Sequence, residues 1–351
     1  MQIKEVARQL NTTTRTIRFY EEKGLIHPIK QENEYRIFTE EDLVRISTIL
    51  ALREIGITIN EIKQLLNDGS RSINSYLNIQ RSALFEKWLE LKDMIATIDQ
   101  MLERSNDGQT EMSEILELSE HLKNLNSIRK SWEDKWNFDS QAVDYDQNLK
   151  MHGYHFNVHQ DYTRALKRVV ETIQLKKGDT CLDIGIGTGN LGSKFIAHGV
   201  NVIGIDQSKN MLHECKKKHP EIDTRNGHFL ALPVMDHQID GIVSSYALHH
   251  IEDEQKLMAF EEMDRVLKPE GEICMVDLMF QNKSHRKAVI DHFTNTGNKV
   301  AVYSIEDEYY ADRSVLIDWF KTNDYQVETY TFNPILSMIY AKKQIEGGSN
   351  C

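Results

Sequence analysis

Three alternating glycines form the most informative chemical motif of this chain. Gly185, Gly187 and Gly189 follow an apolar run that contains Asp183, and an amphipathic segment comes directly after them. Glycines let a backbone turn sharply and approach a ligand closely, and the start of a helix adds a favourable dipole. Asp206 ends the next apolar run about twenty residues later, where an acid can accept hydrogen bonds from both hydroxyls of a ribose. The spacing therefore predicts a loop that binds a nucleotide cofactor.

Histidine is the residue type best suited to acid–base chemistry near this motif, because it titrates close to neutral pH. His249 and His250 follow the apolar run Ile239–Ala247. We consider His249 a candidate general base. The alternative is that His249 caps a strand end, or that His250 fills this structural role instead.

A further group of histidines raises the question of a metal site. His152, His155 and His159 stand three and four residues apart and could share one helix face, which is a spacing found at metal sites. A solvated or lid-packing cluster is the favoured interpretation, and we expect no metal. The four cysteines, which form no CxxC pair, indicate neither a zinc knuckle nor a disulfide framework; they are Cys181, Cys215, Cys274 and Cys351.

A second chemical pattern lies near the N-terminus, where basic and hydroxyl residues open a short amphipathic helix. Two short helices joined by a tight polar turn, followed by an extended wing, are the arrangement that presents a recognition helix to DNA. Arg15 and Arg18 share one helix face, so both can reach the same groove. The alternative is that Arg18 pairs with Glu22 on the surface while Phe19 and Tyr20 belong to the core. We expect Phe19 to be a core residue.

Composition limits the classes of function. The chain has 351 residues, 40% of them hydrophobic, and a net charge of −12, which argues against broad coating of nucleic acid. Residues 1–70 carry ten basic and eleven acidic residues, so a local DNA-binding face is still possible. The N-terminus has no signal-peptide pattern and no apolar run is long enough to cross a bilayer, so we expect a cytoplasmic protein without a membrane partner.

The N-terminal third is expected to be helical. Residues 1–70 predict two helices, a wing at about 27–38 and two more helices, the third beginning at Thr39 and the fourth at a capping box over Thr58–Glu61. A heptad seam then predicts a dimerising coiled coil over residues 72–104, although one helix packed on its own domain is the alternative. The seam residues are Leu77, Leu84, Trp88, Leu91, Ile95, Ile98 and Leu102.

The remainder of the chain alternates between predicted helices and strands. Further helices are expected over 110–135 and 148–175, after which β-branched runs alternate with amphipathic segments and predict a parallel, doubly wound sheet. The expected elements are Thr180–Ile186, Asn190–His198, Asn201–Asp206, Lys209–Lys218, Thr224–Phe229, Ile239–Ala247, Glu254–Leu267, Glu272–Phe280 and a helix over 313–322. Tyr325–Phe332 and Ile335–Lys342 predict a closing antiparallel hairpin, and the last residues a disordered tail.

The N-terminal region closely resembles the MerR family of transcriptional regulators. The resemblance rests on spaced matches that include Thr14–Glu21, Gly24–Ile26, Tyr35–Phe38 and Arg53–Ile57. It implies a dimer on palindromic promoter DNA, which members of the family twist so that RNA polymerase can engage. Metal-sensing members carry cysteines beside the dimer helix, and here no cysteine precedes Cys181. The DNA contacts that the resemblance and the helix pattern predict are Thr14, Arg15, Arg18, Tyr20, Lys23, Tyr35 and Arg36.

The region from about residue 140 to 342 resembles class I S-adenosylmethionine-dependent methyltransferases. The resemblance rests on the glycine motif, on Asp240–His250 and on Val266–Gly271. It implies S-adenosylmethionine as the cofactor, with the methionine part at the glycine loop, the ribose at Asp206 and the adenine beside the residues that follow Gly227. The predicted cofactor contacts are Asp183, Gly185, Gly187, Gly189, Asp206, Gln207, His228, Phe229 and Ser244.

The same resemblance places residues 244–249 beside the reacting sulfonium, which makes Tyr246 and His249 the candidate catalytic residues. One departure concerns the adenine, since the family usually has an acid where this chain has His228. The fourth strand lacks the proline-containing motif of amino-group methylation of nucleic acids, and the chain has no Pro-Cys nucleophile for cytosine methylation. A small-molecule acceptor is therefore favoured, under a lid that would include Tyr145, Tyr154 and the segment 281–312 with Tyr309 and Tyr310.

Together these patterns predict a multidomain chain with an α-rich head and a Rossmann-like body. The expected segments are a winged helix-turn-helix (1–70), a dimerisation coiled coil (71–104), a helical linker (105–139), a methyltransferase domain (140–344) and a tail (345–351). The favoured function is a DNA-binding regulator that methylates a small molecule. The alternatives are a regulator whose body only senses S-adenosylmethionine or another small molecule, and a fusion of two uncoupled activities.

Overall fold

The computed structural model describes residues 1–30, 36–54, 56–67, 73–106, 136–149 and 156–344, with six more positions between 116 and 124. Several sequence predictions lie outside these residues: most of the helix over 110–135, the contact by Tyr35, the histidines His152 and His155, the lid residue Tyr154, and the tail. The chain divides into two compact units, Met1–Ala83 and Leu84–Cys351. None of the described helices is both long and apolar enough to span a bilayer.

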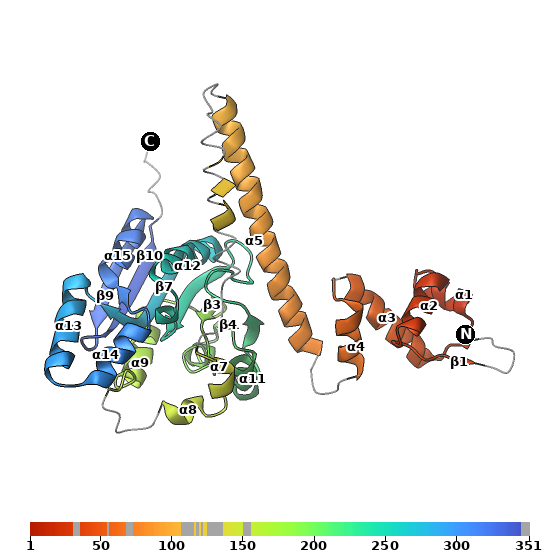
Figure 1. Cartoon of the computed structure of the whole chain (residues 1–351), viewed down its shortest axis with the longest axis horizontal. Coiled ribbons are helices and arrows are strands. Elements are labelled where there is room, and N and C mark those ends of the chain that lie inside the picture. Colours follow the sequence, from red (N-terminus) through yellow and green to blue (C-terminus); the bar gives the residue numbers. More distant parts are fainter. Residues whose placement is uncertain are drawn as a thin grey trace. The chain divides into compact units, whose positions relative to one another are not determined.

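The first unit has the predicted order of two helices, a wing and two more helices (Figure 1). Thr13 caps the second helix by accepting a hydrogen bond from Thr16 N at 3.0 Å. The side chains of Thr39 and Asp42 each accept a hydrogen bond from the other's backbone N–H, as the predicted third helix start requires. The elements are α1 (Ile3–Gln9), α2 (Thr14–Glu22), β1 (Ile29–Lys30), β2 (Arg36–Ile37), α3 (Glu40–Glu54) and α4 (Ile59–Asn67).

The core of this unit corrects one sequence prediction. Phe19 is 39% exposed, whereas Tyr20 on the same helix is only 4% exposed and packs with Ile17. The prediction that Phe19 is a core residue is wrong. The amphipathic face of α2 is centred on Ile17 and Tyr20, which are three residues apart, and Phe19 lies to one side of that face.

A long helix, α5 (Ile73–Asn106), follows. Six residues of the predicted seam are at least 39% exposed in the single chain, which leaves an apolar stripe along the helix. They are Leu77, Leu84, Leu91, Ile95, Ile98 and Leu102. Trp88 differs from them, because the Arg265 guanidinium lies 5.2 Å from its ring and Lys92, which pairs with Asp236 at 2.7 Å, lies over it too.

The second unit is a three-layer α/β domain, as predicted. Its sheet has the strand order β5-β4-β3-β6-β7-β10-β9, with β8 paired to β7. The strands from β5 to β7 are parallel, and β10 is antiparallel to both β7 and β9, which confirms the closing hairpin. The strands are β3 (Thr180–Ile184), β4 (Asn201–Asp206), β5 (Asp223–Asn226), β6 (Ile239–Ser245), β7 (Leu267–Phe280), β8 (Ala311–Asp312), β9 (Tyr325–Thr331) and β10 (Leu336–Lys343).

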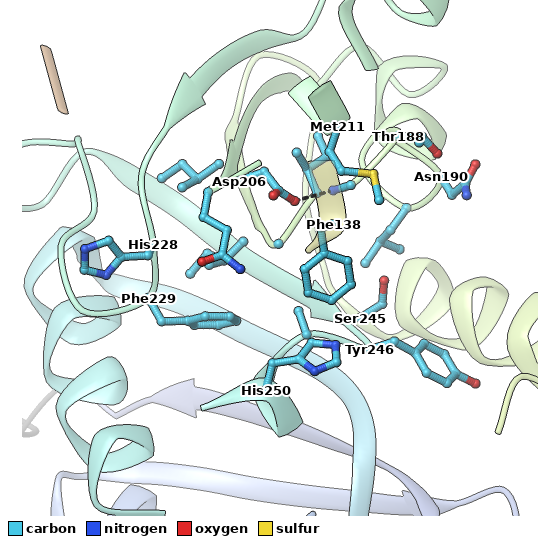
Figure 2. A pocket seen from close by; sticks show the side chains of 18 of the residues that line it. Phe138, Thr188, Asn190, Asp206, Met211, His228, Phe229, Ser245, Tyr246 and His250 are labelled. Carbon is cyan, nitrogen blue, oxygen red and sulfur yellow. Dashed lines mark hydrogen bonds between the residues drawn. The ribbon is translucent and has the colours of Figure 1, made fainter. Parts of the chain in front are cut away.

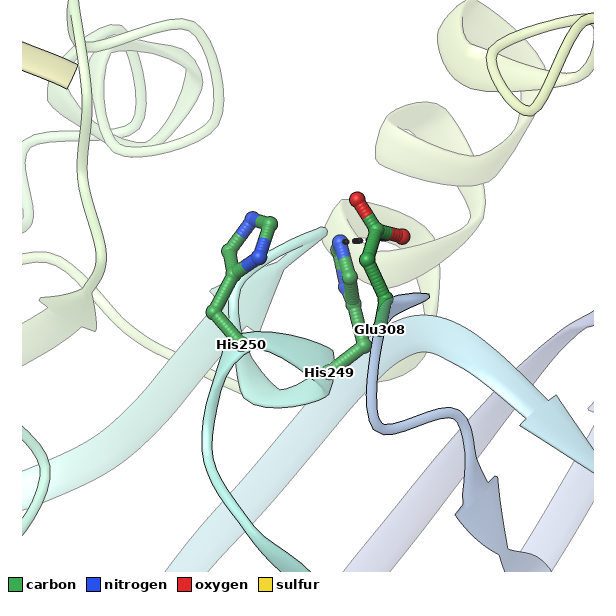
Figure 3. Close-up of side chains that lie close together, drawn as sticks. All are labelled: His249, His250 and Glu308. Atoms are coloured by element: carbon green, nitrogen blue, oxygen red, sulfur yellow. Dashed lines mark ion pairs between the residues drawn. The ribbon is translucent and has the colours of Figure 1, made fainter. Parts of the chain in front are cut away.

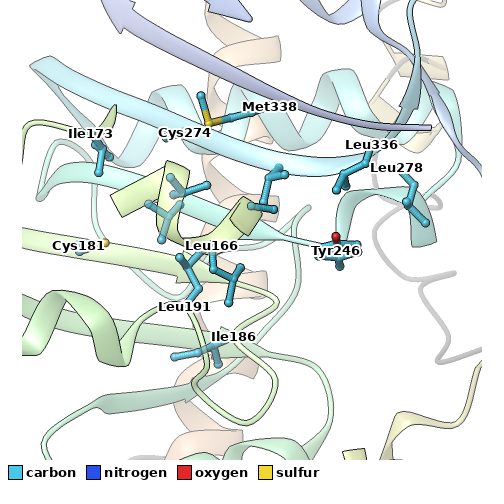
Figure 4. Close-up of a cluster of buried hydrophobic side chains, with 14 of the residues drawn as sticks. Leu166, Ile173, Cys181, Ile186, Leu191, Tyr246, Cys274, Leu278, Leu336 and Met338 are labelled. Atoms are coloured by element: carbon cyan, nitrogen blue, oxygen red, sulfur yellow. The ribbon is translucent and has the colours of Figure 1, made fainter. Parts of the chain in front are cut away.

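Helices cover both faces of the sheet because alternate strand residues point to opposite sides. Cys181 and Leu166 belong to one core (Figure 4), which also contains Val289. Leu182 belongs to the other core, with Phe260 and Phe320. The helices are α7 (Phe138–Gln141), α8 (Tyr145–Asn148), α9 (Tyr162–Thr172), α10 (Ser193–Ile196), α11 (Lys209–Lys218), the 3₁₀ turn η1 (Leu248–His250), α12 (Asp253–Val266), α13 (Lys283–Asn295), α14 (Lys299–Asp307) and α15 (Arg313–Thr322).

Two predicted elements differ from the structure. The predicted continuous helix over 148–175 is wrong, because α9 begins only at Tyr162. Asn157 Oδ1 accepts a hydrogen bond from His159 N at 3.0 Å, a local turn that competes with helix formation. The strand predicted over Thr224–Phe229 ends at Asn226, and an isolated bridge between His228 and Ala231 closes a turn instead.

Candidate functional site

A pocket lies in the second unit at the carboxyl ends of β3, β4 and β6 (Figure 2). Its volume is about 740 Å³, including space that is open to solvent. The chain crosses from one side of β3 to the other at this point, since β4 and β6 flank β3. Such switch points of parallel sheets are where ligands bind. Among the predicted cofactor residues, the pocket is lined by Gly185, Gly187, Asp206, Gln207, His228 and Phe229.

The glycine loop forms the floor of this pocket. Gly185 and Gly187 have φ angles of +70° and +54°, a conformation that side chains disfavour. A Cβ atom on Gly185 would lie 2.4 Å from Cβ of Ala247, so the loop also needs glycine for space. The predicted sharp turn is therefore present, and it brings the backbone of the loop against the pocket.

Asp206 connects the loops on both sides of the pocket. Its Oδ2 accepts a hydrogen bond from Gly187 N at 2.8 Å, and its Oδ1 accepts one from Ser208 N at 2.9 Å. The carboxylate is 9% exposed and lines the pocket. It therefore fixes the glycine loop to the end of β4 and leaves part of its surface toward a ligand.

Asp183 and Ser244 lie behind the pocket and do not line it. Asp183 is 1% exposed, and its Oδ2 accepts a hydrogen bond from Gly192 N at 2.8 Å. Burial raises the pKa of Asp183 to about 8. The Ser244 hydroxyl donates to Ile184 O at 2.8 Å, and its neighbour Ser245 lines the pocket instead.

Residues 137–149, which include α7 and α8, cover one side of the pocket, and we call them the lid segment. Phe138 and Tyr145 line the pocket. Asp139 Oδ1 accepts hydrogen bonds from Ser208 Oγ at 2.6 Å and from Asn210 N at 3.1 Å.

A second acid latches the other end of the lid segment. Asp146 Oδ1 accepts hydrogen bonds from Thr188 Oγ1 at 2.7 Å and Asn190 Nδ2 at 2.9 Å, and Lys218 pairs with its other oxygen. Burial opposes ionisation of Asp146, but these three partners outweigh it and lower its pKa. Both latches join the lid to the loops that follow β3 and β4. The sequence offered no periodic signal for them.

An aromatic wall faces the lid at the end of β6. Tyr246 has a φ angle of +51°, which is uncommon outside glycine and occurs at functional sites. The rings of His159 and Tyr162 lie 5.0 and 5.3 Å from its ring. The Tyr246 hydroxyl is buried and has no hydrogen-bond partner within the described part of the chain. The predicted catalytic tyrosine is therefore part of the pocket wall, with an unused polar atom.

The two neighbouring histidines occupy different places. His250 lines the pocket, and the rings of Trp136 and Phe138 lie 4.6 and 4.9 Å from its ring. Burial lowers the pKa of His250, and the nearby His249 acts in the same direction. His249, the predicted base, is 5% exposed and does not line the pocket.

His249 is held between two carboxylates that the sequence analysis did not identify. Its Nδ1 lies 2.6 Å from Asp277 Oδ1, and its Nε2 lies 3.8 Å from Glu308 Oε2. Burial opposes the charged form of His249, but the carboxylates of Asp277 and Glu308 raise its pKa. Asp277 also accepts hydrogen bonds from Ala247 N and Leu248 N, each at 2.8 Å. Asp277 lies near the carboxyl end of the central strand β7, and this position could have marked it as a candidate site residue.

The predicted DNA contacts in the first unit are mostly exposed. Arg15, Arg18 and Lys23 lie at the surface of α2 or directly after it, and Thr14 is half-buried. Arg36 in the wing donates to Glu21 Oε2 at 2.6 Å, which ties the wing to α2. Tyr20, by contrast, lies in the core.

Comparison with known proteins identifies both units. An uncharacterised methyltransferase of Oceanobacillus iheyensis is 36% identical over 186 residues, which are 53% of this chain and 85% of the relative. Another, of Alkaliphilus oremlandii, is 32% identical over 207 residues, 59% of this chain and 95% of the relative. The chain belongs to this methyltransferase family. A family model described as "Methyltransferase domain" matches residues 181–271. A second family model, described as "MerR HTH family regulatory protein", matches residues 1–69.

The methyltransferase domain is therefore preceded by a helix-turn-helix domain of MerR type, as the two resemblances implied. Among solved structures, the YcgJ protein of Bacillus subtilis is 22% identical, with a TM-score of 0.42. The alignment covers 52% of this chain and 99% of the YcgJ chain.

Proposed function

We propose that this protein is a cytoplasmic, DNA-binding transcriptional regulator whose methyltransferase domain transfers a methyl group from S-adenosylmethionine to a small molecule. One observation carries the proposal. The same chain holds a lidded pocket built on a glycine loop and Asp206, and a MerR-type domain with an exposed basic helix. Because both domains belong to one chain, a cofactor that changes the conformation of the second unit can affect how the first unit binds promoter DNA. It can then also affect how RNA polymerase engages the promoter.

In the cofactor pocket, Asp206 and Gln207 would hold the ribose, and the glycine loop the methionine part. His228 and Phe229 would flank the adenine at the far end of the pocket, where the family usually has an acid. Methyl transfer is an in-line displacement from an activated sulfonium, so alignment and exclusion of water supply most of the catalysis. The lid segment and Tyr246 would provide both. We keep Tyr246 and His249 as the candidate residues on the acceptor side.

On DNA, we propose that Thr14, Arg15, Arg18 and Lys23 contact the groove and its phosphates, with Tyr35 and Arg36 in the wing. Tyr20 would act from the core, where it holds α2 in place. The exposed seam of α5 would pair with a second copy of the chain, since MerR-type regulators resemble one another in working as dimers. Two recognition helices would then reach two half-sites.

The test measures the affinity of the full-length protein for the promoter DNA upstream of its own gene. The titration is made without ligand, with S-adenosylmethionine and with S-adenosylhomocysteine. We expect the affinity to change at least tenfold, about 1.4 kcal/mol of coupling. The Asp206→Ala variant should bind the promoter but lose this response. Equal affinities under all three conditions would contradict coupling and favour two independent activities.

The second candidate is a sensor that binds S-adenosylmethionine without turnover. His228, in place of the usual acid, favours it, because a changed adenine contact is compatible with a ligand-binding role alone. The two functions are distinguished by incubating the protein with methyl-labelled S-adenosylmethionine and cell extract depleted of macromolecules. Labelled small molecules together with S-adenosylhomocysteine support the enzyme, whereas ligand-dependent promoter binding without label transfer supports the sensor.

A further inference from the structure

Three side chains that can bind metal ions converge beside the cofactor pocket. His249 and His250 come from η1, which follows β6, and Glu308 comes from the segment between α14 and β8 (Figure 3). One potential ligand atom from each residue lies within 4.8 Å of those from the other two. His249 Nε2 lies 3.8 Å from Glu308 Oε2.

The backbone around these residues is fixed by hydrogen bonds. Tyr309 N donates to His249 O at 3.0 Å, which joins the chain next to Glu308 directly to η1. Lys256, which is 1% exposed, donates to Ile251 O at 2.8 Å and to Tyr309 O at 2.7 Å. The two segments that carry the three side chains are therefore held together by the fold.

His249 has the outer-shell partner that metal-binding histidines usually have. Its Nδ1 is hydrogen-bonded to the buried Asp277 carboxylate at 2.6 Å, which leaves Nε2 directed toward Glu308. A carboxylate on the far nitrogen orients the ring and makes the ligating nitrogen a stronger donor. Asp277 is itself held by the N–H groups of Ala247 and Leu248, so the ring is oriented before any ion binds.

His250 supplies an independent indication of a missing ligand. Its Nδ1 is buried and has no hydrogen-bond partner in the part of the chain that the structure describes. A buried polar atom without a partner destabilises the folded protein. A metal ion bound by Nδ1 of His250 would give this atom a partner.

We propose that His249, His250 and Glu308 bind a divalent transition-metal ion, with Zn²⁺ the best match to the donor set. Two imidazoles and one carboxylate are the ligands of open, catalytic zinc sites, which keep a fourth position for water or substrate. Imidazole suits zinc, whereas magnesium and calcium prefer oxygen ligands. The cluster is distinct from the His152, His155 and His159 group that the sequence pointed out.

The position of the ion would place it between two cavities. His250 lines the cofactor pocket, and Glu308 lines a neighbouring groove with Lys283, Arg286 and Tyr310. The next inference rests on the proposed methyl transfer. An acceptor thiol or hydroxyl that enters from this groove would bind the open position of the ion as its anion and would release its proton to solvent. The methyl–sulfur bond of the sulfonium would break as the new bond forms, leaving S-adenosylhomocysteine.

The first experiment measures ion binding without cofactor, acceptor or DNA. Full-length protein is treated with a chelator and titrated with Zn²⁺ by calorimetry and with Co²⁺ by visible absorbance. We expect one equivalent of ion per chain, with a Kd below about 1 µM, because three protein ligands bind the ion and leave a fourth position for water. The absence of saturable binding by the wild-type protein would overturn the proposal.

Variants then locate the ion. Glu308→Gln and His250→Gln should each weaken binding by at least about 100-fold, and Asp277→Asn by about 10–100-fold as an outer-shell change. His292→Gln, an exposed histidine of α13, is the matched control and should bind as the wild type does. Unchanged binding in Glu308→Gln and His250→Gln, or an equal loss in the control, would overturn the proposal.

The two proposals fail separately. Folding of each variant is checked by its far-ultraviolet dichroism and thermal midpoint, and cofactor affinity is measured independently of the ion. A protein that binds the ion but not S-adenosylmethionine would contradict the proposed function alone. A protein that binds S-adenosylmethionine but no ion would contradict the metal site alone.

Discussion

Asp206 holds the loops on both sides of the proposed cofactor pocket through hydrogen bonds from Gly187 and Ser208. Asp206→Ala removes these bonds and the proposed acceptor for the ribose hydroxyls. We expect the Kd for S-adenosylmethionine to rise at least tenfold, about 1.4 kcal/mol, as measured by calorimetry. Asp318→Ala, an exposed acid on α15, should not change the affinity. Full affinity in Asp206→Ala would refute the assignment of this pocket to the cofactor.

Asp183 gives a prediction about pH. Its pKa is raised to about 8 by burial, whereas an aspartate in an unfolded chain titrates near about 3.9. Between these values the unfolded chain has released the proton that the folded state retains. The contribution of Asp183 to stability is therefore complete below about pH 4 and is lost as the pH rises through 8.

Asp183→Asn removes this titration. The stability of the variant relative to the wild type should rise between pH 5 and 8 and level off above that range, as followed by thermal midpoints of the protein in a series of buffers. Asp318→Asn, at the surface, should show no such trend. A pH-independent difference for Asp183→Asn would show that Asp183 does not retain its proton in the folded state.

Among the site residues, those close in sequence to the glycine motif could be predicted. Gly185 and Asp206 line the pocket because a strand, a tight turn and the next strand fix their positions locally. Glu308 and Asp277 were not identified, since they reach His249 only through the tertiary fold, from elements well removed in the chain. The structure also shows that His250 lines the pocket and His249 does not, which the spacing of two adjacent residues could not predict.

Among the elements, the lid segment offers the clearest test of how the pocket closes. Asp146 receives hydrogen bonds from Thr188 and Asn190 and pairs with Lys218. Hydrogen bonds to a charged group contribute roughly 1.5–3 kcal/mol each. Asp146→Ala should therefore speed the dissociation of S-adenosylhomocysteine by about tenfold or more, measured by stopped-flow displacement.

The control for this variant lies in the same segment. Asp144 is exposed and makes no side-chain cap at the start of α8, so Asp144→Ala should leave the dissociation rate unchanged. Equal rates for Asp146→Ala and the wild type would show that the latch does not limit release. An equal increase in both variants would mean that the lid is sensitive to any loss of charge.

The elements themselves were predictable where periodicity was strong. The parallel strands and the closing hairpin follow from apolar β-branched runs, and α3 begins at its predicted cap. The start of α9 was not predictable from hydrophobic spacing, because the competing signal is one hydrogen bond from the Asn157 side chain. For the lid segment, the sequence analysis named the aromatic residue Tyr145 but did not predict α7 or α8. These helices are too short to show a hydrophobic period.

For the whole molecule, the order of an α-rich head and a parallel α/β body was predictable, because each has its own pattern of spacing. What links the two is α5, whose exposed seam includes Leu91, Ile95 and Ile98. A contiguous apolar stripe with heptad spacing indicates a partner helix. We expect that partner to be the α5 helix of a second chain.

Ile95→Glu with Ile98→Glu places charges in the middle of this stripe and should convert the dimer into a monomer, measured by sedimentation equilibrium. Promoter affinity should fall at least tenfold because a monomer reaches only one half-site, whereas S-adenosylmethionine affinity should be unchanged. The matched control, Lys87→Glu with Gln100→Glu, changes exposed positions outside the seam and should remain dimeric. A dimer that survives the seam substitutions would show that the copies associate elsewhere, and α5 would then serve as a helix of its own chain only.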